Sequence, residues 1–473
     1  MTGLLTASPS MTIAGEPVTG PATFGVINPA TGQVFAGAPD CSREQLDEAM
    51  RAAQAAAGAW RADQDARRAA LRAAAAATLA AADGLAAILT AEQGKPLKAA
   101  AFEVAEMARW LEYAAGLELP AAVLQDDEQG HAELVHRPLG VVAAITPWNY
   151  PLLLAGWKLG PALLAGNTVV LKPSPFTPLS TLALGSILAG VLPPGVVNAV
   201  SGGDELGAWM TSHPAVAKIS FTGSVPTGKA VAAAAAPDLK RFTLELGGND
   251  AAIVLDDADP ATVERGLFWG AFINNGQICA GIKRIYVPEK LHADVVEALA
   301  QRARRTRVGP GTEAGVQLGP VQNQPQFDRV RGLVADALGR GATAAAGGHP
   351  LDRDGYFFAP TILTGVAEGT PIVDEEQFGP AVPVIPYRDV DDAVARANDT
   401  RYGLSGSVWS ADPDRAAAVA ARLECGTAFV NDHLTLQPYI PFGGMKWSGM
   451  GVENGLWGLA EFTALQVLYR SRR

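Results

Sequence analysis

The sequence predicts an α/β protein built from two tandem units, each with a parallel sheet covered by helices on both faces. Three observations support this prediction. Short β-branched runs alternate with segments of helical character at intervals of about thirty residues, which is the spacing of βαβ units. These runs are apolar without alternation, as strands buried on both faces require. A second series of such runs begins near residue 251, and no internal sequence repeat connects the two series.

The N-terminal part of the chain is expected to be helical and rich in alanine. Ser42 and Gln45 form a capping-box pattern at a helix start. Helix-favouring Ala, Leu and Arg dominate from there to about residue 90, and a second helix is expected from about Leu97 to Gly116. The first ten residues are expected to form a mobile tail.

The elements of the first sheet are expected from residue 141 onward. Its strands are predicted at Val141–Ile145, Thr168–Leu171, Val196–Val200 and Ala217–Phe221. The intervening helices are predicted at Leu152–Leu164 and Leu179–Leu188.

The second sheet is predicted from another set of apolar runs. Its strands are expected at Ala251–Leu255, Arg284–Val287, Val382–Tyr387, Gly406–Trp409 and Thr427–Val430. Asp259 followed by Pro260 is a favourable helix start, and this helix is expected to run to about Asn274.

Composition and charge exclude several classes of protein. The 473 residues carry 37 basic and 48 acidic side chains, a formal net charge of −11, which argues against nucleic-acid binding. No uncharged apolar run reaches the roughly 18 residues of a membrane-spanning helix. The N-terminus also lacks the basic cluster of a secretion signal. We therefore expect neither a nucleic-acid nor a membrane partner.

Cysteine and histidine usage points to a reducing compartment without a catalytic metal. Cys41, Cys279 and Cys425 are odd in number and have neither zinc-site nor disulfide spacing. The six histidines form no HExxH pattern, so no metal is expected. The cytoplasm is the default location for such a chain.

The glycine-rich segment FTGSVPTGKA (221–230) follows a predicted strand and opens a predicted helix. It nearly matches the phosphate loop of mononucleotide-binding proteins, but Ala230 lacks the hydroxyl that would hold Mg²⁺. It also lacks the GxGxxG pattern of dinucleotide sites. A phosphate-binding loop and a ligand-free turn both remain open on this pattern. Lys229 is then expected to be a solvated surface charge.

Three polar residues are candidates for covalent chemistry. Glu245 lies within an apolar run that ends at a glycine pair, and is either an ion-pair member or a tuned base. Cys279 lies in a loop just after a predicted helix, where a thiolate could act as a nucleophile, although most lone cysteines are small buried residues. Asn149 follows a strand, where its amide could bind an oxyanion or simply belong to a proline-rich turn.

Taken together, the motifs of this chain resemble those of the aldehyde dehydrogenase superfamily, in family order and over nearly the full length. The matching segments are INPATG (27–32), PWNYP (147–151), GNTVVLKP (166–173), FTGS (221–224), LELGG (244–248), GQIC (276–279), EQFGP (376–380) and PFGG (441–444). Each alone is a weak signal, but the ordered set is very specific.

The resemblance implies three structural parts and a homodimer or homotetramer. The implied Rossmann-like cofactor domain comprises residues 1–119 and 139–246, and the catalytic domain residues 247–446. Residues 120–138 and 447–473 would form a small β oligomerisation element, from a hairpin and a C-terminal strand near Thr463–Arg470.

The resemblance also implies site roles. Cys279 would be the nucleophile, Glu245 the general base, and Asn149 with the Cys279 N–H the oxyanion hole. Lys158 and Glu453 match positions linked to proton movement in some relatives. The cofactor-binding positions would be Ile145, Trp148, Lys172, Ser174, Gly223, Ser224, Gly228, Leu246, Glu376 and Phe378. The aldehyde pocket would be lined by Tyr150, Leu154, Trp157, Ile273 and Phe442, which indicate an apolar or aromatic substrate.

One departure from the family pattern concerns the cofactor. Many NAD-preferring relatives have a glutamate three residues after the ribose-binding lysine, and this chain has Pro175 there. NAD is expected because no arginine stands nearby in sequence, and NADP remains possible.

Three alternatives accompany this interpretation. An acylating enzyme that transfers its product to coenzyme A is disfavoured because Glu245 is present. A catalytically silent structural homologue is disfavoured because Cys279, Glu245, Asn149 and Lys172 are all intact. A phosphate-loop nucleotidase is disfavoured by Ala230.

Overall fold

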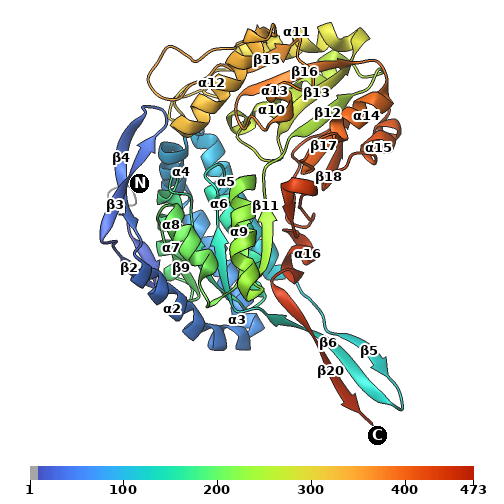
Figure 1. Ribbon diagram of the computed structural model, residues 1–473. Coiled ribbons are helices and arrows are strands. Elements are labelled where there is room, and N and C mark those ends of the chain that lie inside the picture. The colour runs from blue at the N-terminus through green and yellow to red at the C-terminus, as the bar shows by residue number, and fades with distance from the viewer. Residues whose placement is uncertain (1–8, 473) are drawn as a thin grey trace.

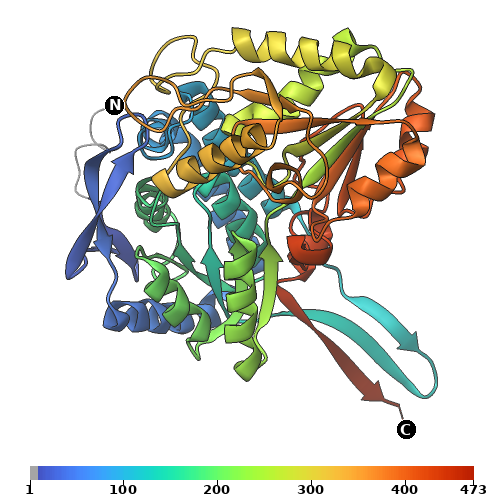
Figure 2. The same cartoon turned by 45° about the horizontal axis from the view of Figure 1, so that its top comes forward.

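A computed structural model describes residues 9–472. Two large sheets form two bodies that face each other, and a long β arm projects from one end of the molecule (Figures 1 and 2). The α/β class is therefore confirmed. Residues 1–8 of the expected mobile tail lie outside the described residues.

The first sheet has eight strands in the order β19-β11-β10-β7-β8-β9-β1-β2. The inner strands β9, β8, β7, β10 and β11 are parallel, whereas β19, β1 and β2 add antiparallel edges. The strands span Met11–Ile13 (β1), Glu16–Val18 (β2), Val141–Ile145 (β7), Thr168–Lys172 (β8), Val197–Ala199 (β9), Val216–Thr222 (β10), Arg241–Glu245 (β11) and Gly449–Met450 (β19). The predicted parallel core is confirmed, and β19 brings a segment assigned to the oligomerisation element to the edge of this sheet.

Helices cover both faces of the first sheet because successive side chains of its strands point to opposite sides. Val142 and Ala144 of β7 pack in the apolar cluster of α3 to α7, whereas Val141 and Ala143 pack in the cluster of α2, α8 and α9. These helices span Arg43–Ala62 (α2), Gln64–Ala80 (α3), Ala82–Gln93 (α4), Leu97–Gly116 (α5), Pro151–Leu164 (α6), Leu179–Ala189 (α7), Asp204–Ser212 (α8) and Val225–Ala235 (α9). The Ser42–Gln45 capping box at the start of α2 is confirmed.

The second sheet has seven strands in the order β14-β15-β16-β13-β12-β17-β18, parallel except for the β14–β15 pair. They span Asp250–Val254 (β12), Ile282–Pro288 (β13), Thr343–Ala346 (β14), Thr361–Thr364 (β15), Ala381–Tyr387 (β16), Ser405–Trp409 (β17) and Thr427–Val430 (β18). Its helices span Pro260–Phe272 (α10), Glu289–Arg305 (α11), Gln324–Gly339 (α12), Pro371–Asp374 (α13), Val390–Asn398 (α14) and Pro413–Ala420 (α15). All five predicted strands are present, and Asp259 caps α10 through the Ala261 N–H.

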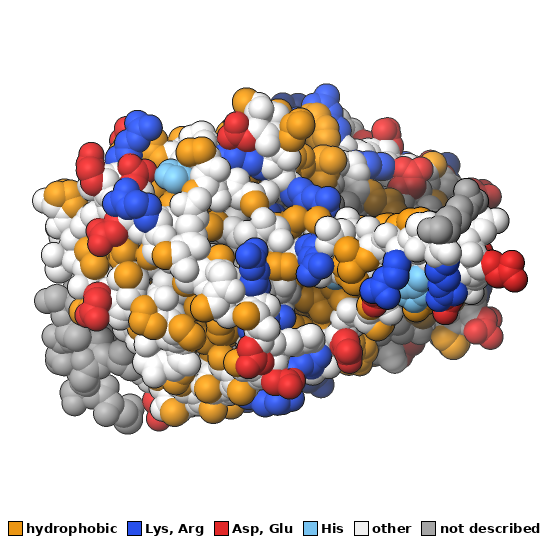
Figure 3. Space-filling model, turned by 90° about the horizontal axis from the view of Figure 1, so that it is seen from below, with side chains coloured by type: hydrophobic (Ala, Val, Ile, Leu, Met, Phe, Trp, Pro, Cys, Tyr) orange, Lys and Arg blue, Asp and Glu red, His pale blue; other side chains and the backbone are white. Residues whose placement is uncertain are grey.

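The arm is a three-stranded antiparallel sheet of β5 (Ala122–Asp126), β6 (Gly130–Pro138) and β20 (Thr463–Ser471). The hairpin and the C-terminal strand therefore lie together as expected. A short helix, α16 (Gly455–Ala460), precedes β20. Figure 3, the view from below, shows hydrophobic and charged side chains intermixed on the face from which the arm projects.

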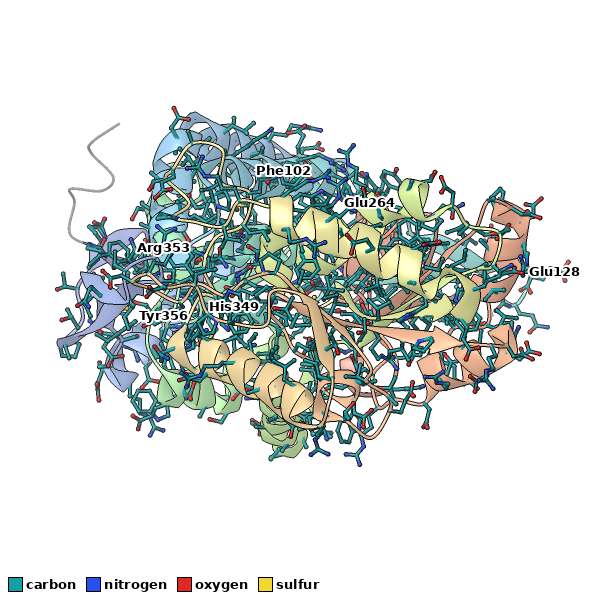
Figure 4. The ribbon with its side chains drawn as sticks, turned by 90° about the horizontal axis from the view of Figure 1, so that it is seen from above. Phe102, Glu128, Glu264, His349, Arg353 and Tyr356 are labelled. Carbon is teal, nitrogen blue, oxygen red and sulfur yellow. The ribbon has the colours of Figure 1, made fainter. Side chains whose placement is uncertain are left out.

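The expectation of a helical N-terminal part is wrong before residue 43. Besides β1 and β2, a hairpin of β3 (Ala22–Asn28) and β4 (Gln33–Asp40) precedes α2. The hairpin reverses at residues 28–32, where the Asn28 side chain accepts a hydrogen bond from the Ala30 N–H and Gly32 adopts a φ of 69°. Tyr356, labelled in Figure 4, donates its backbone N–H to the Pro29 carbonyl at 2.9 Å, which ties the second sheet unit to this hairpin.

Among residues 9–472, no single helix is both long and apolar enough to cross a membrane. The bent pair α3 and α4, at 69° to each other, satisfies the length and composition criteria only when taken together.

Candidate active site

A cleft opens where the strand order of the first sheet reverses direction. The chain continues from β7 to β8 and β9 on one side, and to β10 and β11 on the other. Open parallel sheets bind ligands at such a point, beyond the carboxyl ends of their strands. The cleft has a volume of about 380 Å³ and lies between the two sheet units. Its walls comprise Pro147, Trp148, Asn149, Thr222, Gly223, Ser224, Val225, Pro226, Leu246, Gly247, Cys279, Gln326, Arg329, Glu376, Phe378 and Tyr402.

Cys279 reaches this cleft on a tight loop between α10 and β13. Asn274, Asn275 and Gly276 all have positive φ, so the chain reverses sharply after α10. Asparagine and glycine tolerate this conformation better than other residues do. The thiol is half-buried, and burial followed by the negative charges of Glu245 and Glu376 raises its pKa to about 12. A base is therefore needed to form the thiolate near neutral pH.

Glu245 ends β11 with a buried carboxylate that has no hydrogen-bond partner among the described residues. Burial raises its pKa well above the ordinary value, the charge of Glu453 adds to the rise, and Lys158 opposes it. Lys158 and Glu453 form a buried ion pair of 2.6 Å. The structure thus brings these three predicted residues together, although they lie on β11, α6 and the segment after β19.

Asn149 is held by hydrogen bonds to its side-chain amide and to its backbone carbonyl. Its side-chain amide donates to the Gln277 carbonyl at 3.0 Å, just before Cys279. Its backbone carbonyl accepts from Lys95 at 2.8 Å and from the Asn274 amide at 3.1 Å. The amide group therefore lies beside the nucleophile loop, at the wall of the cleft.

A buried ion pair between Lys95 and Glu103, which no sequence motif indicated, holds the backbone of Asn149 in place. Lys95 contacts Glu103 at 2.5 Å, and both side chains are almost fully buried. The other oxygen of Glu103 accepts the N–H groups of Leu152 and Leu153 at the start of α6. The pair therefore joins α5 and the loop before it to the turn that carries Asn149, a contact that no local sequence pattern predicts.

Several predicted cofactor residues line the cleft. Trp148 and Phe378 form an edge-to-face pair with ring centroids 5.2 Å apart. The Glu376 carboxylate accepts the Gly248 N–H at 3.0 Å, and burial raises its pKa to about 7. A Cβ atom at Gly247 would overlap this carboxylate, so a larger residue there would push the Glu376 side chain aside. Six of the ten predicted residues line the cleft, namely Trp148, Gly223, Ser224, Leu246, Glu376 and Phe378.

The other four lie beside the cleft rather than on its wall. Gly228, in the first turns of α9, packs against Leu246 so closely that a Cβ atom would come within 2.5 Å of it. Ile145 and Lys172 end the adjacent strands β7 and β8, and Ser174 follows Lys172. Burial lowers the pKa of Lys172 to about 8, while Asp204 and Asp40 oppose this effect.

Four of the five predicted aldehyde-pocket residues belong to one apolar cluster with Cys279. Leu154, Trp157 and Phe442 are buried in it, and Tyr150 is half-buried. Trp157 stacks on Trp110 at 5.8 Å and meets Phe442 edge to face. Ile273 is absent from this cluster and is 43% exposed. It therefore lies at the surface.

The fold and cleft define an α/β protein that brings a cysteine thiol to a crevice of about 380 Å³ between its two sheet units. A family model described as the aldehyde dehydrogenase family matches residues 18–468. The chain is 38% identical over 458 residues to the putative aldehyde dehydrogenase FUS7 of Gibberella fujikuroi, covering 97% of each chain. It is also 38% identical to the Escherichia coli succinate-semialdehyde dehydrogenase [NADP(+)] GabD, covering 94% of this chain and 93% of the relative. The NAD⁺ complex of a Bacillus cereus aldehyde dehydrogenase superposes with a TM-score of 0.97 at 34% identity, covering 99% of this chain and 97% of that one.

The chain belongs to the aldehyde dehydrogenase family. The activity of this family is NAD(P)-dependent oxidation of aldehydes, and the chain is an enzyme of that type.

Proposed function

We propose that the protein oxidises an apolar or aromatic aldehyde to the carboxylic acid through a thioester on Cys279. The observation that carries this proposal is the placement of the Cys279 thiol in the cleft, near the unpartnered, buried carboxylate of Glu245. An unpaired buried carboxylate is costly in a fold, which points to a chemical use.

In the first step, the Cys279 sulfur attacks the aldehyde carbon. The Glu245 carboxylate accepts the thiol proton. Its charge already acts on this thiol, which places the two groups in the same site. The C–S bond forms, and the carbonyl oxygen becomes an oxyanion. The Asn149 amide and the Cys279 N–H lie beside this position and can donate to the oxyanion.

The cleft fits a nicotinamide dinucleotide. Ser224 caps the N-terminus of α9 at the cleft wall, where backbone N–H groups favour a phosphate. Lys172 and Ser174 would hold the adenosine ribose, and Glu376 the nicotinamide ribose, with Trp148 and Phe378 beside it. When bound, the cofactor would supply a hydride acceptor for the former aldehyde carbon, on which the C=O bond re-forms to give the thioester.

The thioester is then hydrolysed. Once Glu245 has released the proton that it took from the thiol, it takes a proton from a water molecule, whose oxygen attacks the acyl carbon, and the C–S bond breaks to return the Cys279 thiolate. Glu453 and Lys158 lie beside Glu245 and can pass its proton onward. Retention of this carboxylate supports water, rather than coenzyme A, as the acyl acceptor.

The substrate class is inferred from the apolar cluster around Cys279. Tyr150, Leu154, Trp157 and Phe442 offer aromatic and aliphatic surface without a charge among them. Such surface favours an apolar or aromatic aldehyde over one with a carboxylate. NAD is the proposed cofactor. Pro175 leaves NADP possible because it carries no negative charge to repel a 2′-phosphate.

We also propose a homodimer or homotetramer joined through the arm. Exposed apolar side chains on this projecting sheet support a partner surface. They are Val123, Leu124, Leu465, Val467, Leu468 and Tyr469. On this basis residues 120–138 and 447–473 would form the oligomerisation element, with the cofactor domain at 1–119 and 139–246 and the catalytic domain at 247–446. The three cysteines form no disulfide, which supports a cytoplasmic location.

The test is a scan of aliphatic, aromatic and carboxylate-bearing aldehydes with NAD and NADP, following the absorbance of the reduced cofactor. We expect the highest kcat/KM for apolar or aromatic aldehydes, with product formation independent of coenzyme A. Reduced cofactor that appears only when coenzyme A is present would assign the acylating reaction instead.

A further inference from the structure

Lys283 is a buried lysine beside the loop that carries Cys279. It lies on β13, four residues after the cysteine. Its ammonium group donates to the Ile278 carbonyl at 2.6 Å and to the Gly281 carbonyl at 3.0 Å. No carboxylate among residues 9–472 forms a direct ion pair with it. Its charge is therefore satisfied by peptide oxygens of the nucleophile loop.

The hydrogen bond from Lys283 to the Ile278 carbonyl fixes the direction of the Cys279 N–H. The Ile278 carbonyl and the Cys279 N–H belong to one planar trans peptide and point in opposite directions. Lys283 holds the carbonyl toward the protein interior, so the N–H points away from it. This N–H donates to no described residue, and Cys279 itself lines the cleft.

Neighbouring groups hold the rest of the loop. His433 contacts the Ala280 carbonyl at 2.8 Å, and Ser405 donates to the same oxygen at 3.2 Å. Burial lowers the pKa of His433 to about 4, so this ring is neutral near pH 7. Lys283 is the lysine of the set that binds the loop carbonyls; burial lowers its pKa, whereas the negative charges of Glu376, Asp250 and Cys279 oppose this effect and favour the ammonium form.

The charges that face Cys279 act in opposite directions. Burial and the carboxylates of Glu245, Glu376 and Asp250 raise the thiol pKa, whereas Lys283 lowers it. The Asp250 carboxylate accepts a hydrogen bond from the Ser405 hydroxyl. The phenol of Tyr150 also faces the Cys279 thiol. A positive charge this deep in the protein acts strongly because little solvent screens it.

We propose that Lys283 is a positioning residue that turns the Cys279 N–H toward the cleft and stabilises the Cys279 thiolate by its charge. It acts through the loop rather than by touching the substrate. The inference rests on the proposed function in one respect, namely that Cys279 is the nucleophile.

The test measures alkylation of Cys279 by iodoacetamide as a function of pH, with the modified peptide identified by mass spectrometry. Lys283→Met removes the charge, Lys283→Gln removes it but keeps a donor, and Lys283→Arg keeps it. An opposite charge typically shifts a pKa by about one to three units. We therefore expect alkylation at pH 8 to slow at least about tenfold in Lys283→Met and Lys283→Gln, with the pH midpoint moved upward. Lys283→Arg should stay close to the wild type.

The matched control is Lys240→Met. Lys240 is also buried and donates to two backbone carbonyls, those of Thr211 and His213, but it lies away from the cleft. Its removal should leave the Cys279 profile unchanged. Cys41 and Cys425 serve as internal references in every sample.

A Cys279 profile in either neutral variant that superposes on the wild type would overturn the proposal. So would equal slowing in Lys283→Arg and Lys283→Met. If both neutral variants failed to fold while Lys240→Met folded, Lys283 would have only a structural role. Alkylation needs neither aldehyde nor cofactor, so this result is separable from failure of the proposed oxidation.

Discussion

Lys95 donates a hydrogen bond of 2.8 Å to the backbone carbonyl of Asn149. The same ammonium group pairs with Glu103 and lies 3.8 Å from the centre of the Tyr150 ring. A buried charge from the loop between α4 and α5 thus fixes the turn that carries the proposed oxyanion donor, so the N-terminal helical region bears directly on the site.

Removing the Lys95–Glu103 pair should lower kcat more than it raises KM. Lys95→Met alone leaves Glu103 as an uncompensated buried charge, which costs about 3–5 kcal/mol of stability. The double variant Lys95→Met/Glu103→Gln avoids this charge but still releases the Asn149 turn. Because a misplacement of about 1 Å can cost about 10²-fold, we expect a tenfold to hundredfold loss of kcat. Steady-state kinetics and thermal unfolding together test this, and full kcat in a folded double variant would contradict it.

Asn149→Ala should remove one of the two proposed oxyanion donors. Loss of such a donor costs about 10²–10³ in kcat, while cofactor binding should change little because the amide lies at the Cys279 loop. Stopped-flow measurement of the first turnover locates the loss in thiohemiacetal formation and hydride transfer. A defect confined to deacylation would assign Asn149 a different role.

The pH dependence of deacylation should follow the Glu245 carboxylate. A raised pKa means that the base form is populated only as pH rises through that value, so the rate should climb with pH. Because Glu453 raises this pKa and Lys158 lowers it, Glu453→Gln should move the rising limb to lower pH and Lys158→Met to higher pH. Single-turnover hydrolysis of the acyl-enzyme measures each limb. Shifts of the same sign in both variants would be inconsistent with this arrangement.

Pro175→Glu should increase the preference for NAD over NADP. The new carboxylate would lie three residues after Lys172 and repel a 2′-phosphate. We expect kcat/KM with NADP to fall at least about tenfold, while that with NAD is kept. Pro175→Gln provides the uncharged control. An equal loss with both cofactors in the glutamate variant would point to a local folding defect instead.

The parallel core of each sheet was predictable because strands buried on both faces must be continuously apolar. The fully buried strand at Val141–Ile145 matches the structure residue for residue, as does the half-exposed edge strand at Thr427–Val430, whose Thr, Phe and Val favour a strand. The four strands before α2 were not predictable in this way. The β4 strand exposes Val34 and Phe35 to solvent, so its apolar residues do not mark one buried face.

The site, like the fold, has residues that the sequence predicted and residues that it did not. Motif order identified Cys279, Glu245 and Asn149, but not the groups that set their environment. Lys95 lies in the loop between α4 and α5 and Glu103 on α5, both far from Asn149 in sequence, and their contact with the Asn149 turn depends on tertiary packing. The position of Lys283 could have been noticed in the sequence, because a charged side chain within the apolar strand IKRIYVP needs buried polar partners. Ile273, in contrast, matched a pocket position in sequence yet lies exposed.

The most direct measurement uses Glu245→Gln protein incubated with NAD and an aromatic aldehyde, then quenched in acid and digested for peptide mass spectrometry. The proposed mechanism predicts an acyl group on the peptide that contains Cys279, released by hydroxylamine and absent from Cys279→Ser protein. Acid formation with no acyl group on Cys279, or with the acyl group on Cys41 or Cys425, would contradict it.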